Sequence, residues 1–156
     1  MIEIYTDGSC HTQSCIGAWV AILFINGEKI VLSGMATDTT NNRMELTAVI
    51  KAIEYVKDKH QSATTIKIIS DSQYVIGLVG RKEKFALSDF KTKAGNDIRI
   101  VDLVKQLLGL HELIDVAYVK IKAHQQPTSE VNYNIEADIL ARQILRDAVN
   151  KGTIVQ

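Results

Sequence analysis

The chain has 156 residues, 46% of them hydrophobic, and its 18 Lys and Arg residues balance 18 Asp and Glu residues. This length suits one domain, because two cores could not both be filled well, and the composition excludes long disorder. No apolar run approaches the roughly 20 residues of a membrane helix, and the first residues lack the pattern of a secretory signal. We expect a single cytoplasmic domain over residues 1–156, in which Cys10 and Cys15 are free thiols.

The first part of the sequence predicts three strands. Short apolar or alternating runs cover Ile2–Thr6, Ile16–Ile25 and Lys29–Met35. Asn26-Gly27, between the last two, is a typical hairpin turn. Consecutive strands joined in this way predict an antiparallel meander.

The rest of the sequence alternates helices with strands. Apolar residues at helical spacing predict a helix over Asn42–Lys59, and a β-branched run predicts a buried strand over Thr64–Ile69. The later elements, in chain order, are a helix over Ser72–Val79, a helix over Ile98–Leu110, a strand over Val116–Ile121 and a helix over Asn132–Val149. Strands separated by helices join a sheet in parallel, so we predict an α/β fold. Its mixed sheet would hold the meander and two parallel strands, with helices on both faces.

Two aspartates follow predicted strands. Asp7 ends the first strand, and Asp71 ends the fourth. Neighbouring strands that finish in this way place both carboxylates at one edge of the sheet, where α/β proteins usually bind ligands. Either aspartate alone is more simply explained as a turn former or a helix cap. The pair favours a functional site.

Two further carboxylates lie on predicted helices. Glu45 lies on or beside the apolar face of its helix, where a carboxylate costs free energy unless it is paired, hydrogen-bonded or bound to a cation. Asn42 and Glu45 also fit an N-cap with a returning carboxylate, and this alternative stays open. Asp138 lies beside the apolar stripe of the last helix. Its alternative is an exposed residue that pairs with Arg142 four positions on.

Together, the four carboxylates predict a metal centre. If they converge, they repel one another unless cations neutralise them, and hard oxygen ligands suit Mg²⁺ or Mn²⁺. Two such ions can drive an in-line displacement at phosphorus, in which one activates the attacking water and the other stabilises the leaving 3′-oxygen. The residues alone therefore indicate a metal-assisted phosphodiester hydrolase.

Five segments of the chain resemble the motifs of type 1 ribonucleases H, in the order and spacing of that family. They are Tyr5-Thr6-Asp7-Gly8-Ser9-Cys10, Thr40-Asn41-Asn42-Arg43-Met44-Glu45-Leu46, Ser70-Asp71-Ser72-Gln73-Tyr74-Val75, Lys122-Ala123-His124 and Asn134-Ile135-Glu136-Ala137-Asp138-Ile139-Leu140-Ala141-Arg142. Each motif alone is weak evidence, whereas all of them over essentially the whole chain are specific.

The resemblance implies a ribonuclease H-like fold and an endoribonuclease that hydrolyses the RNA strand of RNA·DNA hybrids. Catalysis would use two metal ions and leave 5′-phosphate and 3′-hydroxyl ends. The ions, Mg²⁺ with Mn²⁺ as a substitute, would be held by Asp7, Glu45, Asp71 and Asp138. The remaining catalytic residue, His124, would assist proton transfer or product departure, because an imidazole titrates near neutral pH.

The resemblance also implies how the hybrid is bound. Contacts with its minor groove, through base edges and the 2′-hydroxyls that distinguish RNA from DNA, would come from Gly8, Asn41, Asn42 and Gln73. Thr40 would hold a DNA-strand phosphate at a helix start, and Asn134 would orient groups near the site. The hybrid is the expected partner of a monomer that needs no membrane and no obligate protein partner.

The sequence departs from the family in three places. A basic protrusion rich in Trp follows the third motif in well-known bacterial members, whereas residues 80–97 here hold five basic residues, no Trp, and the aromatic residues Phe85 and Phe90. Cys10–Cys15 replaces the early Gly-rich turn, and Gln125-Gln126 follows the histidine. The balanced net charge is also unusual for a nucleic-acid binder. The first departure concerns the grip on the hybrid more than the cutting, whereas Gln125-Gln126 concerns the geometry of the loop that carries His124.

Three other functions fit parts of the pattern. A non-catalytic binding domain of the same fold would lack a metal carboxylate, and none is missing. A metal-binding protein without nuclease activity would not need Asn41, Asn42 and Gln73. The third is the excised nuclease domain of a reverse transcriptase. The start at Met1 and the end soon after Val149 favour a freestanding enzyme over that alternative.

Overall fold

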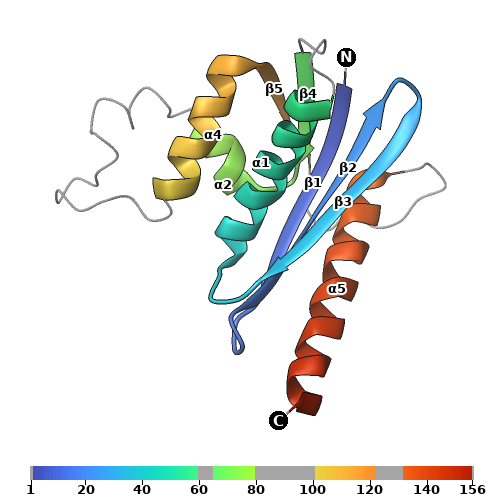
Figure 1. The fold of residues 1–156 in the computed structure, drawn as a ribbon, viewed down its shortest axis with the longest axis vertical. Helices are drawn as coiled ribbons and strands as arrows, with labels where there is room; N and C mark the ends of the chain where they lie inside the picture. The colour runs from blue at the N-terminus through green and yellow to red at the C-terminus, as the bar shows by residue number, and fades with distance from the viewer. Residues whose placement is uncertain (1, 60–64, 80–100, 122–131, 156) are drawn as a thin grey trace.

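The computed structural model of the chain describes residues 2–59, 65–79, 101–121 and 132–155 (Figure 1). In chain order, its elements are β1 (Ile2–His11), β2 (Ile16–Ile25), β3 (Glu28–Ala36), α1 (Asn41–Lys59), β4 (Thr65–Ser70), α2 (Gln73–Val79), α4 (Val101–Leu113), β5 (Asp115–Lys120) and α5 (Tyr133–Val155). The predicted elements are confirmed in type and order within the described ranges, and their ends differ by a few residues. None of the helices in these ranges is long and apolar enough to cross a membrane.

The sheet confirms the predicted topology. Its strand order is β3-β2-β1-β4-β5, with antiparallel pairing between β1 and β2 and between β2 and β3, and parallel pairing of β4 with β1 and of β5 with β4. The hairpin between β2 and β3 turns at Asn26 and Gly27, which both have positive φ angles, of 51° and 82°. This backbone twist matches that of the flanking strands, which explains why Asn-Gly is favoured there.

Helices cover the two faces of the sheet differently. Ile4, Leu23 and Ile68 belong to the larger core cluster, to which α1, α2 and α4 contribute. The alternate residues Val20 and Ile22 face the other way and form a smaller cluster with α5. Figure 1 shows α5 apart from the other helices. The period of two along β2 therefore fills one core on each face of the sheet.

The prediction that Asp7 ends its strand is wrong. β1 continues to His11, because its antiparallel pairing with β2 extends to the pair His11 and Ile16. The parallel pairing of β1 with β4, in contrast, ends at Thr6 and Ser70. Asp7 is therefore the first residue of β1 beyond the end of its parallel neighbour, and Asp71 is the first residue beyond β4.

The prediction of Asn42 as the helix cap is also wrong. α1 begins one residue earlier, at Asn41, and the Thr40 hydroxyl oxygen accepts a hydrogen bond of 3.2 Å from the Arg43 backbone N–H. Thr40 is therefore the N-cap residue, and its bond satisfies one of the free N–H groups of the first turn. Glu45 takes no part in this cap.

Candidate active site

Three carboxylates meet where the parallel strands end. One oxygen each from Asp7, Glu45 and Asp71 lies within 4.8 Å of the other two. These residues come from β1, from α1 and from the residue after β4. The convergence that the sequence predicts for these three is therefore present, although they lie far apart in the chain.

Gly8 explains how Glu45 comes so close to Asp7. A Cβ atom at Gly8 would lie 2.5 Å from the Glu45 backbone nitrogen and 2.8 Å from the Met44 carbonyl oxygen. Real Cβ atoms essentially never approach backbone so closely, so the first turns of α1 lie directly on β1 because this residue has no side chain. The resemblance assigned Gly8 to the substrate, but the structure gives it a packing role as well.

Burial and mutual repulsion shift the titration of two of these carboxylates. Asp7 is only 5% exposed. Burial, followed by the charges of Asp71 and Asp138, raises its pKa from 3.8 to about 8. Burial, followed by the charges of Asp7 and Asp71, raises the pKa of Glu45 from 4.5 to about 9. In the metal-free protein, both groups therefore favour the neutral form at pH 7.

The donor set fits a divalent cation. Glu45 Oε2 is buried and has no hydrogen-bond partner among the described residues. A buried oxygen without a partner costs free energy, and neighbouring carboxylates add repulsion. A hard cation would relieve both costs, and carboxylate oxygens are the ligands that Mg²⁺ and Mn²⁺ prefer.

Asp138 reaches the same site from α5. A hydrogen bond between its side chain and Asp7 contributes to the raised pKa of Asp7. Asp138 also forms an ion pair with Arg142, whose Nε lies 3.2 Å from Asp138 Oδ1. The two explanations of Asp138, a site residue and a partner of Arg142, are thus both compatible with its position. It lies beside the cluster of three carboxylates and is not among them.

A pocket of about 320 Å³ surrounds the carboxylates. Its lining residues are Asp7, Gly8, Ser9, Asn41, Glu45, Asp71, Ser72, Asp138 and Arg142. Ser9, Ser72 and Arg142 were not assigned to the site from the sequence. The two serines follow Asp7 and Asp71 by two residues and one residue, so their places in the motifs could have indicated them.

The structure places the expected substrate residues in different environments. Asn41 lines the pocket, and its side-chain oxygen accepts a hydrogen bond of 2.6 Å from the Cys10 backbone N–H. Thr40, Asn42 and Gln73 are exposed at the starts of α1 and α2, outside the pocket lining.

Two expected site residues remain, Asn134 and His124. Asn134 is 2% exposed, and its Oδ1 has no partner among the described residues. The side chain of Asn132 caps α5 by accepting hydrogen bonds from the Asn134 and Ile135 backbone N–H groups. His124 and the basic stretch within residues 80–97 lie outside the described residues.

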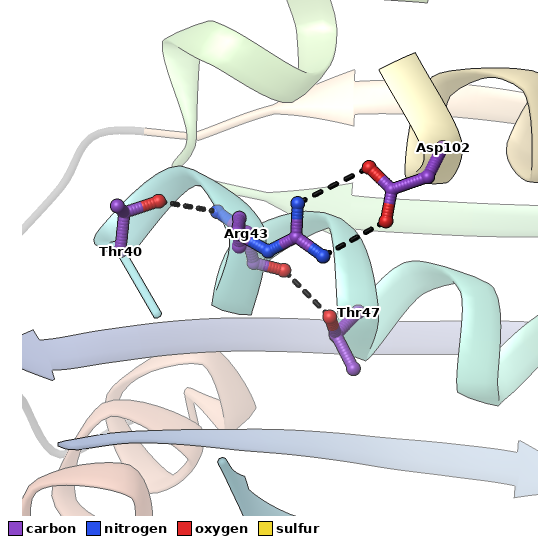
Figure 2. Close-up of polar contacts among 4 residues, drawn as sticks. All are labelled: Thr40, Arg43, Thr47 and Asp102. Carbon is purple, nitrogen blue, oxygen red and sulfur yellow. Dashed lines mark hydrogen bonds and ion pairs between the residues drawn. The ribbon is translucent and has the colours of Figure 1, made fainter. Parts of the chain in front are cut away.

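A fixed cation lies near the start of α1. The Arg43 guanidinium donates two hydrogen bonds to the Asp102 carboxylate of α4, of 3.1 and 2.9 Å (Figure 2). The Thr47 hydroxyl donates a bond of 2.6 Å to the Arg43 carbonyl oxygen. The hydrogen bonds from Arg43 hold the pKa of Asp102 below its usual value. Figure 2 shows Arg43 between Thr40 and Asp102, so the N-cap of α1 and the ion pair between Arg43 and Asp102 lie side by side.

The fold and the site together define an α/β protein with a mixed five-stranded sheet and a carboxylate cluster at the end of its parallel strands. Residues 1–146 match the family model described as RNase H. The chain belongs to the RNase H family, whose members are hydrolases that act on RNA in RNA·DNA hybrids.

Relatives share this similarity along their length. Ribonuclease H of Chlorobium luteolum is 37% identical over 147 residues, which cover 93% of this chain and 95% of that protein. Ribonuclease H of Chlorobium phaeobacteroides (strain DSM 266) is 34% identical, with 94% and 96% covered. Ribonuclease H of Caldicellulosiruptor saccharolyticus is 31% identical, with 94% and 97% covered. The resemblance found in the motifs is therefore confirmed.

Proposed function

We propose that this protein is an endoribonuclease that hydrolyses the RNA strand of RNA·DNA hybrids by two-metal-ion catalysis. The products would carry 5′-phosphate and 3′-hydroxyl ends. The observation that carries the proposal is the cluster of Asp7, Glu45 and Asp71, with ligand oxygens within 4.8 Å of one another and Glu45 Oε2 buried without a partner among the described residues. Membership of the RNase H family supports the choice of substrate.

The metal ligands would be Asp7, Glu45, Asp71 and Asp138. They would hold two Mg²⁺ ions, with Mn²⁺ as a substitute, which when bound supply an activated water and stabilise the charge on the leaving oxygen. Asp7 and Glu45 have raised pKa values and must lose their protons to act as ligands. Asp138 and Asp71 complete the negative charge that the ions balance.

Proton transfer would fall to His124. An imidazole can donate a proton to the departing 3′-oxygen or assist the departure of the product, because it titrates near neutral pH. Asn134 would orient groups near the scissile phosphate. Its buried position, 2% exposed, suits a side chain with one fixed orientation.

The hybrid would be held through its minor groove and its backbone. Contacts with base edges and 2′-hydroxyls would come from Gly8, Asn41, Asn42 and Gln73. The bond from Cys10 to the Asn41 oxygen leaves the Asn41 amide N–H groups to donate. Thr40 and the first N–H groups of α1 would bind a DNA-strand phosphate, and the ion pair between Arg43 and Asp102 would hold the start of α1 in place beside it. Such contacts read shape more than base sequence.

The working unit would be a monomeric single domain over residues 1–156 in the cytoplasm, with the hybrid duplex as its partner. The proposal is tested by offering Mg²⁺ or Mn²⁺ with a labelled RNA·DNA hybrid and, in parallel, single-stranded RNA, double-stranded RNA and double-stranded DNA. We expect cleavage of the hybrid's RNA strand alone, with 3′-hydroxyl ends that a polymerase can extend. Cleavage that continues in EDTA, or a hybrid that is bound and never cut with either ion, would contradict it.

A further inference from the structure

A second pocket adjoins the carboxylate pocket, between the end of β1 and α5. Its volume is about 330 Å³, and its lining residues are His11, Arg142, Leu145, Arg146, Val149 and Asn150. Arg142 lines both pockets, so they meet at its side chain. The contrast in charge is sharp, because four carboxylates line the first pocket, whereas two arginines and no acidic residue line the second.

Arg146 is the uncommitted cation of this second pocket. Its side chain is exposed, and it forms no ion pair with any residue in the described ranges. Its chain neighbour Asp147 projects from a different side of the helix, because adjacent helical residues do not face each other. Arg142 is already paired with Asp138 at 3.2 Å and mainly joins the two pockets. A guanidinium without a carboxylate partner is well suited to bind a phosphate group.

His11, at the end of β1, adds a ring N–H donor to this pocket. The Ser14 backbone N–H donates to His11 Nδ1 over 3.2 Å, and the Ser14 hydroxyl oxygen lies 2.8 Å from the same nitrogen. Because a backbone N–H can only donate, Nδ1 carries a lone pair, and the ring proton of the neutral form is on Nε2. His11 therefore presents an N–H donor on the other side of its ring.

The second pocket lies further along both β1 and α5 than the carboxylates do. From Asp7 to His11, β1 advances four residues, or about 13 Å, and from Asp138 to Arg146, α5 advances eight residues, or about 12 Å. Figure 1 shows that β1 and α5 run in the same general direction. A strand of duplex advances roughly 3.4 Å per nucleotide. The second pocket is therefore a few nucleotides of one strand away from the carboxylates.

We propose that the pocket of His11, Arg142 and Arg146 is a subsite for a backbone phosphate of the RNA strand, a few nucleotides from the bond that is cut. The inference rests on the proposed function. It assigns the RNA strand because the subsite adjoins the carboxylates, which the cut strand must reach. Leu145 and Val149 provide an apolar wall for the sugar next to that phosphate.

Binding is measured in the Asp71→Asn background with Mg²⁺, so that the hybrid is not consumed. Arg146→Ala should raise the Kd about three- to fivefold and lower the slope of log Kd against log salt by about 1, as expected for one lost phosphate contact. Arg146→Lys should restore most of the affinity. The matched control is Lys51→Ala, which removes an exposed cation of α1 that lines neither pocket and should change neither quantity.

The position of the phosphate is found with hybrids that carry one neutral methylphosphonate at successive sites of the RNA strand. At one site, a few nucleotides from the cut bond, the methylphosphonate should weaken binding to the Asp71→Asn protein as much as Arg146→Ala does. In the Arg146→Ala protein, a methylphosphonate at that same site should cause no further loss of affinity. Additive losses at every site would overturn the subsite.

Failure of the subsite and failure of the proposed function give different results. If the otherwise unaltered protein cuts hybrids but Arg146→Ala matches Lys51→Ala in Kd and salt slope, only the subsite is wrong. If the unaltered protein neither binds nor cuts a hybrid, the proposed function fails, and the subsite fails with it.

Discussion

Arg43 and Asp102 join α1 to α4 through two parallel hydrogen bonds, of 3.1 and 2.9 Å. The residues are 59 positions apart in the chain, and α4 packs on α1 in the larger core cluster. The guanidinium and carboxylate planes suit this bidentate geometry, which lysine could not reproduce. The pair joins the start of α1 to α4, beside the Thr40 cap where we propose that the DNA strand is held.

The contribution of this pair to stability should be modest. The side chains are 32% and 61% exposed, so solvent screens the pair. Asp102→Asn should lower the free energy of unfolding by less than about 1 kcal/mol at pH 7. Because the folded-state pKa of Asp102 is lowered, its contribution is present above the unfolded-state value and is lost as pH falls through the folded-state value. Urea unfolding of both proteins at neutral and at strongly acidic pH measures this, and a loss above about 2 kcal/mol would contradict it.

Gly8→Ala should abolish cleavage and weaken Mg²⁺ binding. The added methyl group would lie 2.5 Å from the Glu45 backbone nitrogen, so α1 must move away from β1 and carry the Glu45 carboxylate with it. The control is Gly109→Ala on the exposed side of α4, where a Cβ meets nothing within 4 Å. This control should raise stability by about 0.5–1 kcal/mol and leave cleavage unchanged. Full activity of Gly8→Ala would show that the contact does not position Glu45.

The metal-free protein should lose stability as pH rises. Folded Asp7 and Glu45 have pKa values of about 8 and about 9, above their ordinary values of 3.8 and 4.5. Between these limits the folded state binds more protons than the unfolded state, so the free energy of unfolding falls from about pH 4 to about pH 9. Because bound Mg²⁺ replaces protons, it should raise the melting temperature more at pH 8.5 than at pH 6. Melting curves in EDTA and in Mg²⁺ test this, and a metal-free protein that is most stable at pH 8.5 would contradict it.

Glu45→Gln should separate stability from activity. At pH 8.5 in EDTA, the variant should melt at a higher temperature than the unaltered protein. Folded Glu45 must either keep its proton far above its ordinary pKa of 4.5 or ionise beside Asp7 and Asp71, and a neutral amide avoids both costs. Added Mg²⁺ should stabilise the variant less, and hybrid cleavage should be lost. Asp147→Asn changes an exposed carboxylate of α5 and serves as the control, with no expected change in either measurement. If Glu45→Gln melts at a lower temperature than the unaltered protein in EDTA, the claim that the Glu45 carboxyl group destabilises the metal-free protein is wrong.

The sheet was predictable because its signals are local. The apolar run of β2 and the Asn26-Gly27 turn are properties of short segments, and each matches the structure. The end of β1 was not predictable in this way, because β2 keeps pairing with β1 after β4 has ended. The cap of α1 was ambiguous for a related reason: Thr40, Asn41 and Asn42 are all good N-cap residues, and the packing of the helix selects the first.

The candidate site also combines residues that the sequence indicates locally with features that depend on tertiary packing. Asp7, Glu45 and Asp71 stood out because each interrupts an apolar pattern, and the structure brings them within 4.8 Å. The packing role of Gly8 depends on a tertiary contact with α1, which no spacing within β1 reveals. The pocket of His11 and Arg146 joins residues from opposite ends of the chain that belong to no motif. Such a pocket emerges only from the packing of α5 along β1.

The most direct test of the central claim is single-turnover cleavage of a labelled RNA·DNA hybrid, with Mg²⁺ titrated against the unaltered protein and Asp71→Asn. We predict cleavage of the RNA strand by the unaltered protein that rises with Mg²⁺ and disappears in EDTA. Asp71→Asn should bind the hybrid and leave it intact. Cleavage by Asp71→Asn at the rate of the unaltered protein, or cleavage in EDTA, would contradict the claim that these carboxylates hold the catalytic metal ions.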